Sequence, residues 1–150
     1  MDALPVKTSA CGPKARRMFC NQMFIARYIF LIVLLTAIAV LHAHALKFNI
    51  YWTVWWYDIP MHFLGGAWTG FLGLAFIYRN RSLSEVTLSK KIYYGLLSAI
   101  VAGIIWEIFE YHFGLYGVSK NFYIKDTAKD LVMDMLGGAT VVPFLLGWLK

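Results

Sequence analysis

Three aspartates spaced four residues apart open the last apolar segment, in the stretch KDTAKDLVMDMLGG at residues 125–138. On an α-helix a step of four residues turns the side chain by only about 40°, so Asp126, Asp130 and Asp134 form one stripe. Carboxylates at the edge of an apolar helix cost free energy unless they are paired, solvated or bound to a cation. This stripe is therefore the first candidate for chemistry.

Two other apolar segments carry ionisable groups in comparable places. Asp58 and His62 are four residues apart at the start of one, and Glu107 and Glu110 are three apart near the end of another. Residues three or four apart lie on one helix face, and small residues continue each stripe deeper into the segment. Small residues let helices approach closely, so we expect the ionisable groups to converge above a close-packed contact.

A bound divalent cation is an economical way to hold so many carboxylates together. Oxygen ligands with one imidazole suit Mg²⁺, Mn²⁺, Zn²⁺, Ca²⁺ or a pair of iron ions, and the sequence does not choose among them. We predict a divalent metal site whose candidate ligands are Asp58, His62, Glu107, Glu110, Asp126, Asp130 and Asp134.

Two classes of function fit such a site. It can be catalytic, with a metal-activated water or hydroxyl acting on a lipid or envelope-precursor headgroup at the outer leaflet, as in a hydrolase or transferase. Alternatively, the same acids bind or conduct a cation or proton. For the enzyme, the candidate catalytic carboxylates are Glu107, Glu110 and Asp134, and the candidate phosphate-binding residues are Lys120, Lys125 and Lys129.

A purely structural role is the third interpretation. Asp58 and Asp126 are each well placed to cap the N-terminus of a helix. Lys125 and Lys129 can neutralise Asp126 and Asp130 as ordinary ion pairs. Glu107, Glu110 and Asp134 lie further inside apolar runs and are harder to explain in this way.

The remaining histidines are expected outside the site. His42 and His44 alternate at the end of the first apolar run and cannot share a helix face, so both are predicted to lie at the membrane interface. His112 is off the stripe of Glu107 and Glu110 and is predicted to be structural.

Composition places these segments in a membrane. The 150-residue chain is 60% hydrophobic with a mean hydropathy of +0.61, and only 15% of its residues are charged, against about 25% in an average soluble domain. The net charge of +6 forms no basic patch interleaved with aromatic residues, so nucleic acid is not an expected partner, whereas membrane lipids are. Cys11 and Cys20 show no metal spacing and are predicted to be free thiols.

Hydropathy predicts an all-α, polytopic bundle of four transmembrane helices, each about 20 residues long. Residues 1–23 are predicted to be a cytoplasmic basic tail and 24–150 the transmembrane domain; a cleavable signal peptide ending at Ala43-His44-Ala45 is the alternative for the first run. The oligomeric state is not predicted. The four spans are expected at Phe24–Leu46, Asp58–Tyr78, Ile92–Phe113 and Ala128–Leu149.

An aromatic stretch, KFNIYWTVWWY, separates the first two spans at residues 47–57. Tryptophan and tyrosine at this density are typical of a segment that lies among lipid headgroups. A groove that binds sugar or lipid is the functional alternative.

Charge distribution orients the helices. With the N-terminus in the cytoplasm, ten of the fourteen lysines and arginines lie on the cytoplasmic side, and Lys47, Lys120, Lys125 and Lys129 lie outside. We predict a protein of the inner, or plasma, membrane with both termini in the cytoplasm. Six of the eight acids then share one depth near the outer face.

The motifs also resemble a known family. The chain has D-x-x-x-H-F-x-G-G at Asp58–Gly66, W-E-x-x-E at Trp106–Glu110 and D-x-x-x-D-x-x-x-D-x-x-G-G at Asp126–Gly138. This set resembles the YjdF-like bacterial inner-membrane proteins and, more distantly, the VanZ-like proteins. Glu110 stands where the VanZ-like pattern has a glutamine, and no arginine follows it, so a resistance role is not carried over. The YjdF-like resemblance implies the architecture and the site but no particular chemistry.

Overall fold

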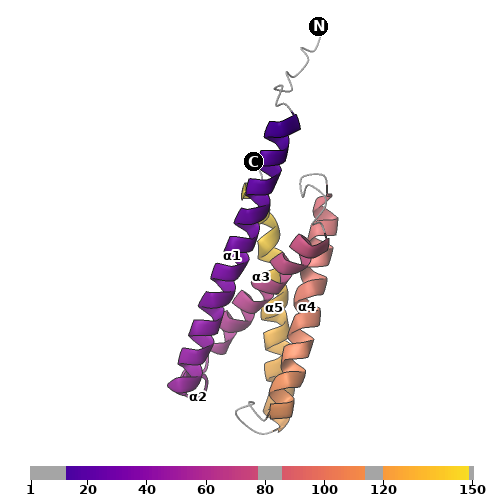
Figure 1. The fold of residues 1–150 in the computed structure, drawn as a ribbon. Helices are drawn as coiled ribbons and strands as arrows, with labels where there is room; N and C mark the ends of the chain where they lie inside the picture. The colour runs from indigo at the N-terminus through magenta and orange to yellow at the C-terminus, as the bar shows by residue number, and fades with distance from the viewer. Residues whose placement is uncertain (1–12, 78–85, 114–119, 149–150) are drawn as a thin grey trace.

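Four long helices and one short turn of helix make up the described part of the chain (Figure 1). The computed structural model describes residues 13–77, 86–113 and 120–148, with side chains at 25–77, 86–113 and 124–141. Within these residues there is no strand, which confirms the predicted all-α class. The helices are α1 (Pro13–Lys47), α2 (Ile50–Thr53), α3 (Asp58–Ile77), α4 (Leu88–Phe113) and α5 (Lys120–Trp148).

Three helices of the described chain are long and apolar enough to cross a membrane. They are Ile25–Lys47 within α1, all of α3 and all of α4, and they correspond to the first three predicted spans. Helix α5 is not among them; its described side chains, at residues 124–141, include five charged ones, Lys125, Asp126, Lys129, Asp130 and Asp134. The fourth span therefore stays a prediction.

Helix ends differ from the predicted spans mainly by extension. Helix α1 begins at Pro13, inside the segment predicted as a tail, where proline is well suited to the first helical position. Helix α5 begins at Lys120 and not at Ala128. A hydropathy pattern marks where a chain becomes apolar, whereas the helix continues wherever its backbone hydrogen bonds are satisfied.

Helix α3 is at the centre of the bundle. It packs against α4 and α5, which also contact each other, while α1 packs mainly on α3 (Figure 1). The three inner helices meet at glycines: a Cβ on Gly70 would lie 2.9 Å from the Cα of Gly138, and one on Gly95 would lie 3.1 Å from the Gly138 carbonyl oxygen. The predicted close contact of small residues is thus present, with backbone against backbone.

Helix α1 is held by a small apolar core beside this contact. Leu31 packs with Phe71 and Leu74 of α3, and the indole of Trp68 donates a hydrogen bond to the Leu31 carbonyl oxygen at 2.9 Å. Only 11% of the apolar part of α1 is buried, against 39% of α3. An apolar helix with most of its surface uncovered is what a lipid-facing position requires.

The aromatic stretch folds over the end of α1. Helix α2 is a single turn that starts after Asn49, whose φ of 55° lies in the left-handed region that asparagine tolerates. The Tyr57 hydroxyl donates to the Leu41 carbonyl oxygen at 3.2 Å and ties the stretch to α1. Trp55 is 81% exposed, and Trp52 and Trp56 are about half exposed. Their place in the headgroup layer stays a prediction.

One end of the bundle collects the ionisable groups. The end of α1, α2, the start of α3, the end of α4 and the start of α5 all lie at the lower end in Figure 1. The acids of three helices are therefore brought to one end, as the sequence predicted.

Candidate functional site

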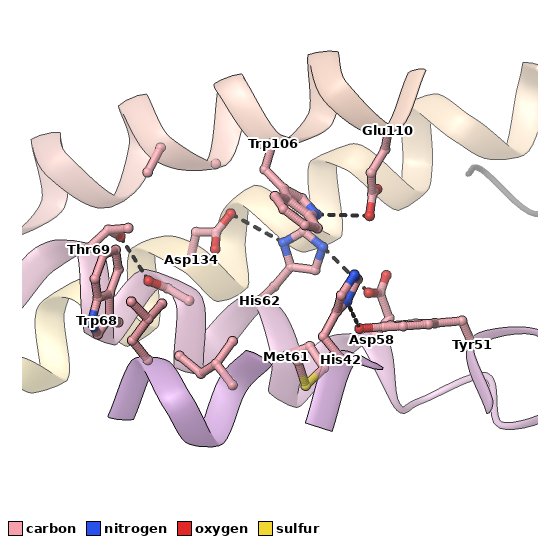
Figure 2. A pocket seen from close by; sticks show the side chains of 15 residues that line it. His42, Tyr51, Asp58, Met61, His62, Trp68, Thr69, Trp106, Glu110 and Asp134 are labelled. Atoms are coloured by element: carbon pink, nitrogen blue, oxygen red, sulfur yellow. Dashed lines mark hydrogen bonds and ion pairs between the residues drawn. The ribbon is translucent and has the colours of Figure 1, made fainter. Parts of the chain in front are cut away.

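His62 lies at the centre of the site. This residue of α3 is only 5% exposed. Its Nε2 atom is 3.5 Å from Asp58 Oδ1, one turn earlier on the same helix, and its Nδ1 atom is 3.4 Å from Asp134 Oδ2 on α5 (Figure 2). Each nitrogen of one buried imidazole therefore faces a carboxylate.

Two sets of potential metal ligands share this histidine. Asp58, His62 and Asp130 form one, and His62, Glu107 and Glu110 form the other; in each, the ligand atoms lie within 4.8 Å of one another. The sets draw on α3, α4 and α5. With Asp134, six of the seven predicted metal ligands are therefore brought together around His62.

Asp126 is the predicted ligand that the structure places at the edge. Its side chain is 43% exposed and pairs with Lys129, whose Nζ lies 2.6 Å from Asp126 Oδ1. Lys129 Nζ is also 3.3 Å from Asp130 Oδ1, so the ordinary ion pairs weighed from the sequence exist here. Lys125 is exposed, and the Lys120 side chain lies outside the described residues.

Neighbouring polar groups orient the buried carboxylates. Thr127 of α5 donates a hydrogen bond of 2.6 Å to Glu107 Oε2, and the indole of Trp106 donates one of 2.8 Å to Glu110 Oε1. Asp130 is 2% exposed; its Oδ1 accepts no hydrogen bond from the described residues and lies 3.3 Å from Lys129 Nζ. Contacts of this kind fix the direction in which a carboxylate presents its free lone pairs.

Glycines make room for Asp134. A Cβ on Gly66 of α3 would overlap the Asp134 backbone, and a Cβ on Gly103 of α4 would overlap its Oδ2 atom. Asp134 therefore fits between the two helices because both positions lack a side chain. The glycine stripes position a site residue as well as closing the bundle.

A cavity of about 240 Å³ adjoins the cluster. It lies between α1, α3 and α4, with Asp134 of α5 in its wall, and Asp58, His62 and Glu110 face it (Figure 2). The sequence did not predict a cavity, because three helices that pack unequally leave a space that no single stripe reveals.

His42 and Tyr51 also line this cavity, and the predicted interfacial depth of His42 stays a prediction. The Tyr51 hydroxyl and His42 Nδ1 are hydrogen bonded at 2.8 Å, and the His42 ring meets Trp106 edge-on at 5.6 Å between ring centroids. Burial and the nearby Asp58 carboxylate raise the pKa of Tyr51 above its usual value, so the phenol keeps its proton and can donate this bond. The predicted topology puts His42 at the same depth as the acids, and this shared depth is the sequence feature that could have indicated a position beside the site. His44 and His112 are exposed, outside the cluster.

This arrangement defines a helical membrane protein with a buried, acidic, histidine-centred cluster at one end of its bundle. The chain belongs to the family described as predicted membrane proteins, DUF2238, whose sequence profile matches residues 14–150. The match agrees with the YjdF-like resemblance at the level of the family and gives no support to the VanZ-like one. No curated protein and no solved structure matches this chain.

Proposed function

We propose that the protein binds a divalent cation at the His62 cluster and uses it to act on the headgroup of a membrane lipid or envelope precursor at the outer leaflet. The observation that carries the proposal is the sharing of one buried imidazole by two sets of carboxylates from three helices. Five carboxylates converge there, and the ammonium group of Lys129 lies beside one of them, Asp130. A 2+ ion would offset the repulsion that remains between the carboxylates.

The membrane arrangement proposed with it has four spans, with α5 as the fourth. Asp130 and Asp134 are 2% and 5% exposed, because α3 and α4 cover them. These two aspartates, the deepest charges of α5, therefore do not face lipid, and a span tolerates buried charges on its inner face. The exposed tryptophans near α2 would then lie in the outer headgroup layer.

The donor set suits an oxygen-preferring or borderline cation. Carboxylate oxygens dominate and one imidazole nitrogen is present, which fits Mg²⁺, Mn²⁺ or Zn²⁺. Such a cation would polarise a phosphoryl group and lower the pKa of a bound water. Glu110 faces the cavity and is held by Trp106, so it is the residue we assign to proton transfer there.

The lysines contribute less than the sequence suggested. Lys129 is engaged by Asp126 and Asp130, and Lys125 is exposed; neither lines the cavity. In this proposal the cation, and not a lysine, receives the phosphate. Lys120, Lys125 and Lys129 would act only by attracting an anion towards the outer face.

A cation- or proton-binding role without chemistry is the second candidate. It is favoured by the placement of a carboxylate beside each ring nitrogen of His62, at 3.4 and 3.5 Å, which is the geometry of a proton relay. A proton relay needs no metal, whereas the proposed enzyme retains one.

Elemental analysis of the full chain, purified in mild detergent and dialysed against trace Zn²⁺, Mn²⁺ and Mg²⁺, tests the proposal. We expect about one or two ions per chain. His62→Ala, Asp130→Asn and Glu107→Gln should each lose most of the metal, since the two amide changes preserve volume and remove charge. Lys125→Ala, an exposed charge change on α5, should retain it. A folded wild-type protein that binds no metal would favour the proton relay and contradict the enzyme.

A further inference from the structure

We propose that the cavity beside the cluster binds one hydrocarbon chain of a phosphate-bearing amphiphile, which reaches it from the lipid between α1 and α4. The proposal deepens the function above by naming the class of ligand. The phosphate part of the proposal depends on the cation proposed above, whereas the hydrocarbon-chain part depends on the cavity alone.

The cavity has a polar end and an apolar end. Along α1 its lining runs from His42 through Ile38 to Leu35, a distance of about 10 Å at 1.5 Å per residue. Glu110 of α4 faces the polar end, and Ala102, two turns earlier, faces the apolar end. A ligand that fills this space must be amphiphilic, with its head at the His62 cluster.

Polar atoms at the apolar end are already satisfied by backbone. The Thr69 hydroxyl donates to the Gly65 carbonyl oxygen at 2.9 Å, and the Trp68 indole donates to the Leu31 carbonyl oxygen at 2.9 Å. Both side chains line the cavity without needing a partner from its contents. This end therefore offers hydrocarbon and aromatic surface, which suits an alkyl chain.

Access is from the side. Helix α1 packs on α3 but is not a close-packed neighbour of α4. The His42 and Trp106 rings bridge the two helices at the polar end, while Leu35 and Trp106 remain 44% and 38% exposed on the two rims. An opening between two lipid-facing helices admits a chain directly from the bilayer.

Volume limits the ligand to a narrow shape. About 240 Å³ is below the usual range for the cavities of drug-sized ligands, about 300–1,000 Å³. One chain segment and the inner part of a headgroup fit, whereas the body of a two-chain lipid does not. A second chain, where one exists, would stay in the bilayer.

Photolabelling tests the proposal on the full, metal-loaded chain in detergent. The probe is a long-chain alkyl phosphate with a diazirine in its chain. In the wild type we expect the label on the α1 and α4 segments that contain Leu35 and Ala102, with competition by unlabelled alkyl phosphate. Ala102→Phe fills the apolar end and should reduce labelling roughly ten-fold. Val101→Phe places the same ring on the exposed neighbouring face and should leave labelling unchanged.

The outcomes separate the two proposals. Ala102→Phe should keep its metal, so labelling lost with metal retained supports the chain site. Wild-type label spread over all exposed helix faces, or equal labelling of Ala102→Phe and Val101→Phe, would overturn the chain site and leave the metal site standing. Stronger labelling by the matching alkyl trimethylammonium probe, or no loss of phosphate labelling after metal removal, would overturn the phosphate head.

Discussion

His62 sits between carboxylates from its own helix and from α5, and it is the ligand common to both sets around the proposed cation. A buried imidazole with a carboxylate near each nitrogen can carry protons that it donates to those carboxylates, or it can bind a metal ion together with them. A proton relay through this ring needs only one carboxylate at each nitrogen. Glu107, Glu110 and Asp130 also converge on the ring, and these additional acids favour a metal.

Tyr51 is predicted to stabilise the cavity wall and not the metal. Tyr51→Phe removes the 2.8 Å hydrogen bond to His42 and should cost about 0.5–1.5 kcal/mol of unfolding free energy. The measurement is a denaturation curve in mild detergent, with metal content determined on the same sample. Tyr93→Phe, at an exposed position on α4, is the control and should cost almost nothing. A loss of metal in Tyr51→Phe would mean that this residue belongs to the cation site.

The residues of the site could largely be predicted from the sequence. Asp58, His62, Glu107, Glu110, Asp130 and Asp134 stand at helix spacing in apolar runs, where a charge is costly and so informative. Asp126 has the same spacing but is paired with Lys129 at the edge, and spacing alone does not give depth. His42 was left out of the site because it shares no helix face with His44, and its contacts with Tyr51 and Trp106 on other helices do not follow from spacing along one helix.

At the scale of the helices, glycine determines how closely α3, α4 and α5 approach. Gly65 and Gly66 are adjacent on α3 but have opposite surroundings. A Cβ on Gly66 would overlap the Asp134 backbone, whereas a Cβ on Gly65 would meet only Asp134 Oδ1, at 4.0 Å. Gly65 faces the cavity and Gly66 faces α5.

This pair makes a matched test of the packing. Gly66→Ala should destabilise the fold by about 1–3 kcal/mol or more, because the atom it meets is backbone and cannot rotate away. Gly65→Ala should be neutral or stabilising by up to about 1 kcal/mol, since alanine favours a helix and space is open. Melting temperatures in detergent measure both. Equal effects of the two changes would show that the α3–α5 contact is assigned to the wrong face.

Hydropathy predicted which segments form the helices, but not all their ends or their unequal packing. The backbone contact at Gly70, Gly95 and Gly138 follows from the small-residue stripes seen in the sequence. The loose fit of α1 does not, because Phe24–Leu46 is apolar on every side and carries no stripe that shows which face contacts α3. The cavity is a consequence of that loose fit and could not be predicted.

For the whole molecule, the proposal depends on which side of the membrane holds the cluster. The bias of lysine and arginine predicts both termini in the cytoplasm and the cluster outside. Reporters active only in the cytoplasm should work when fused after Lys150 or within residues 81–89, and should be silent within residues 114–121. The reverse pattern would place the cluster at the cytoplasmic face and exclude an outer-leaflet substrate.

The most direct measurement is the effect of a divalent cation on thermal unfolding of the wild type and of Asp130→Asn. A metal that binds only the folded protein should stabilise the wild type by about 2.7 kcal/mol at 100 times its dissociation constant, which raises the melting temperature by about 5–10 °C. Asp130→Asn should lose most of this shift, because its 2% exposed carboxylate is a proposed ligand. If the wild type gives no shift with Zn²⁺, Mn²⁺ or Mg²⁺, and Asp130→Asn simply melts at a higher temperature, the acids are a crowded cluster relieved by neutralisation and the metal site does not exist.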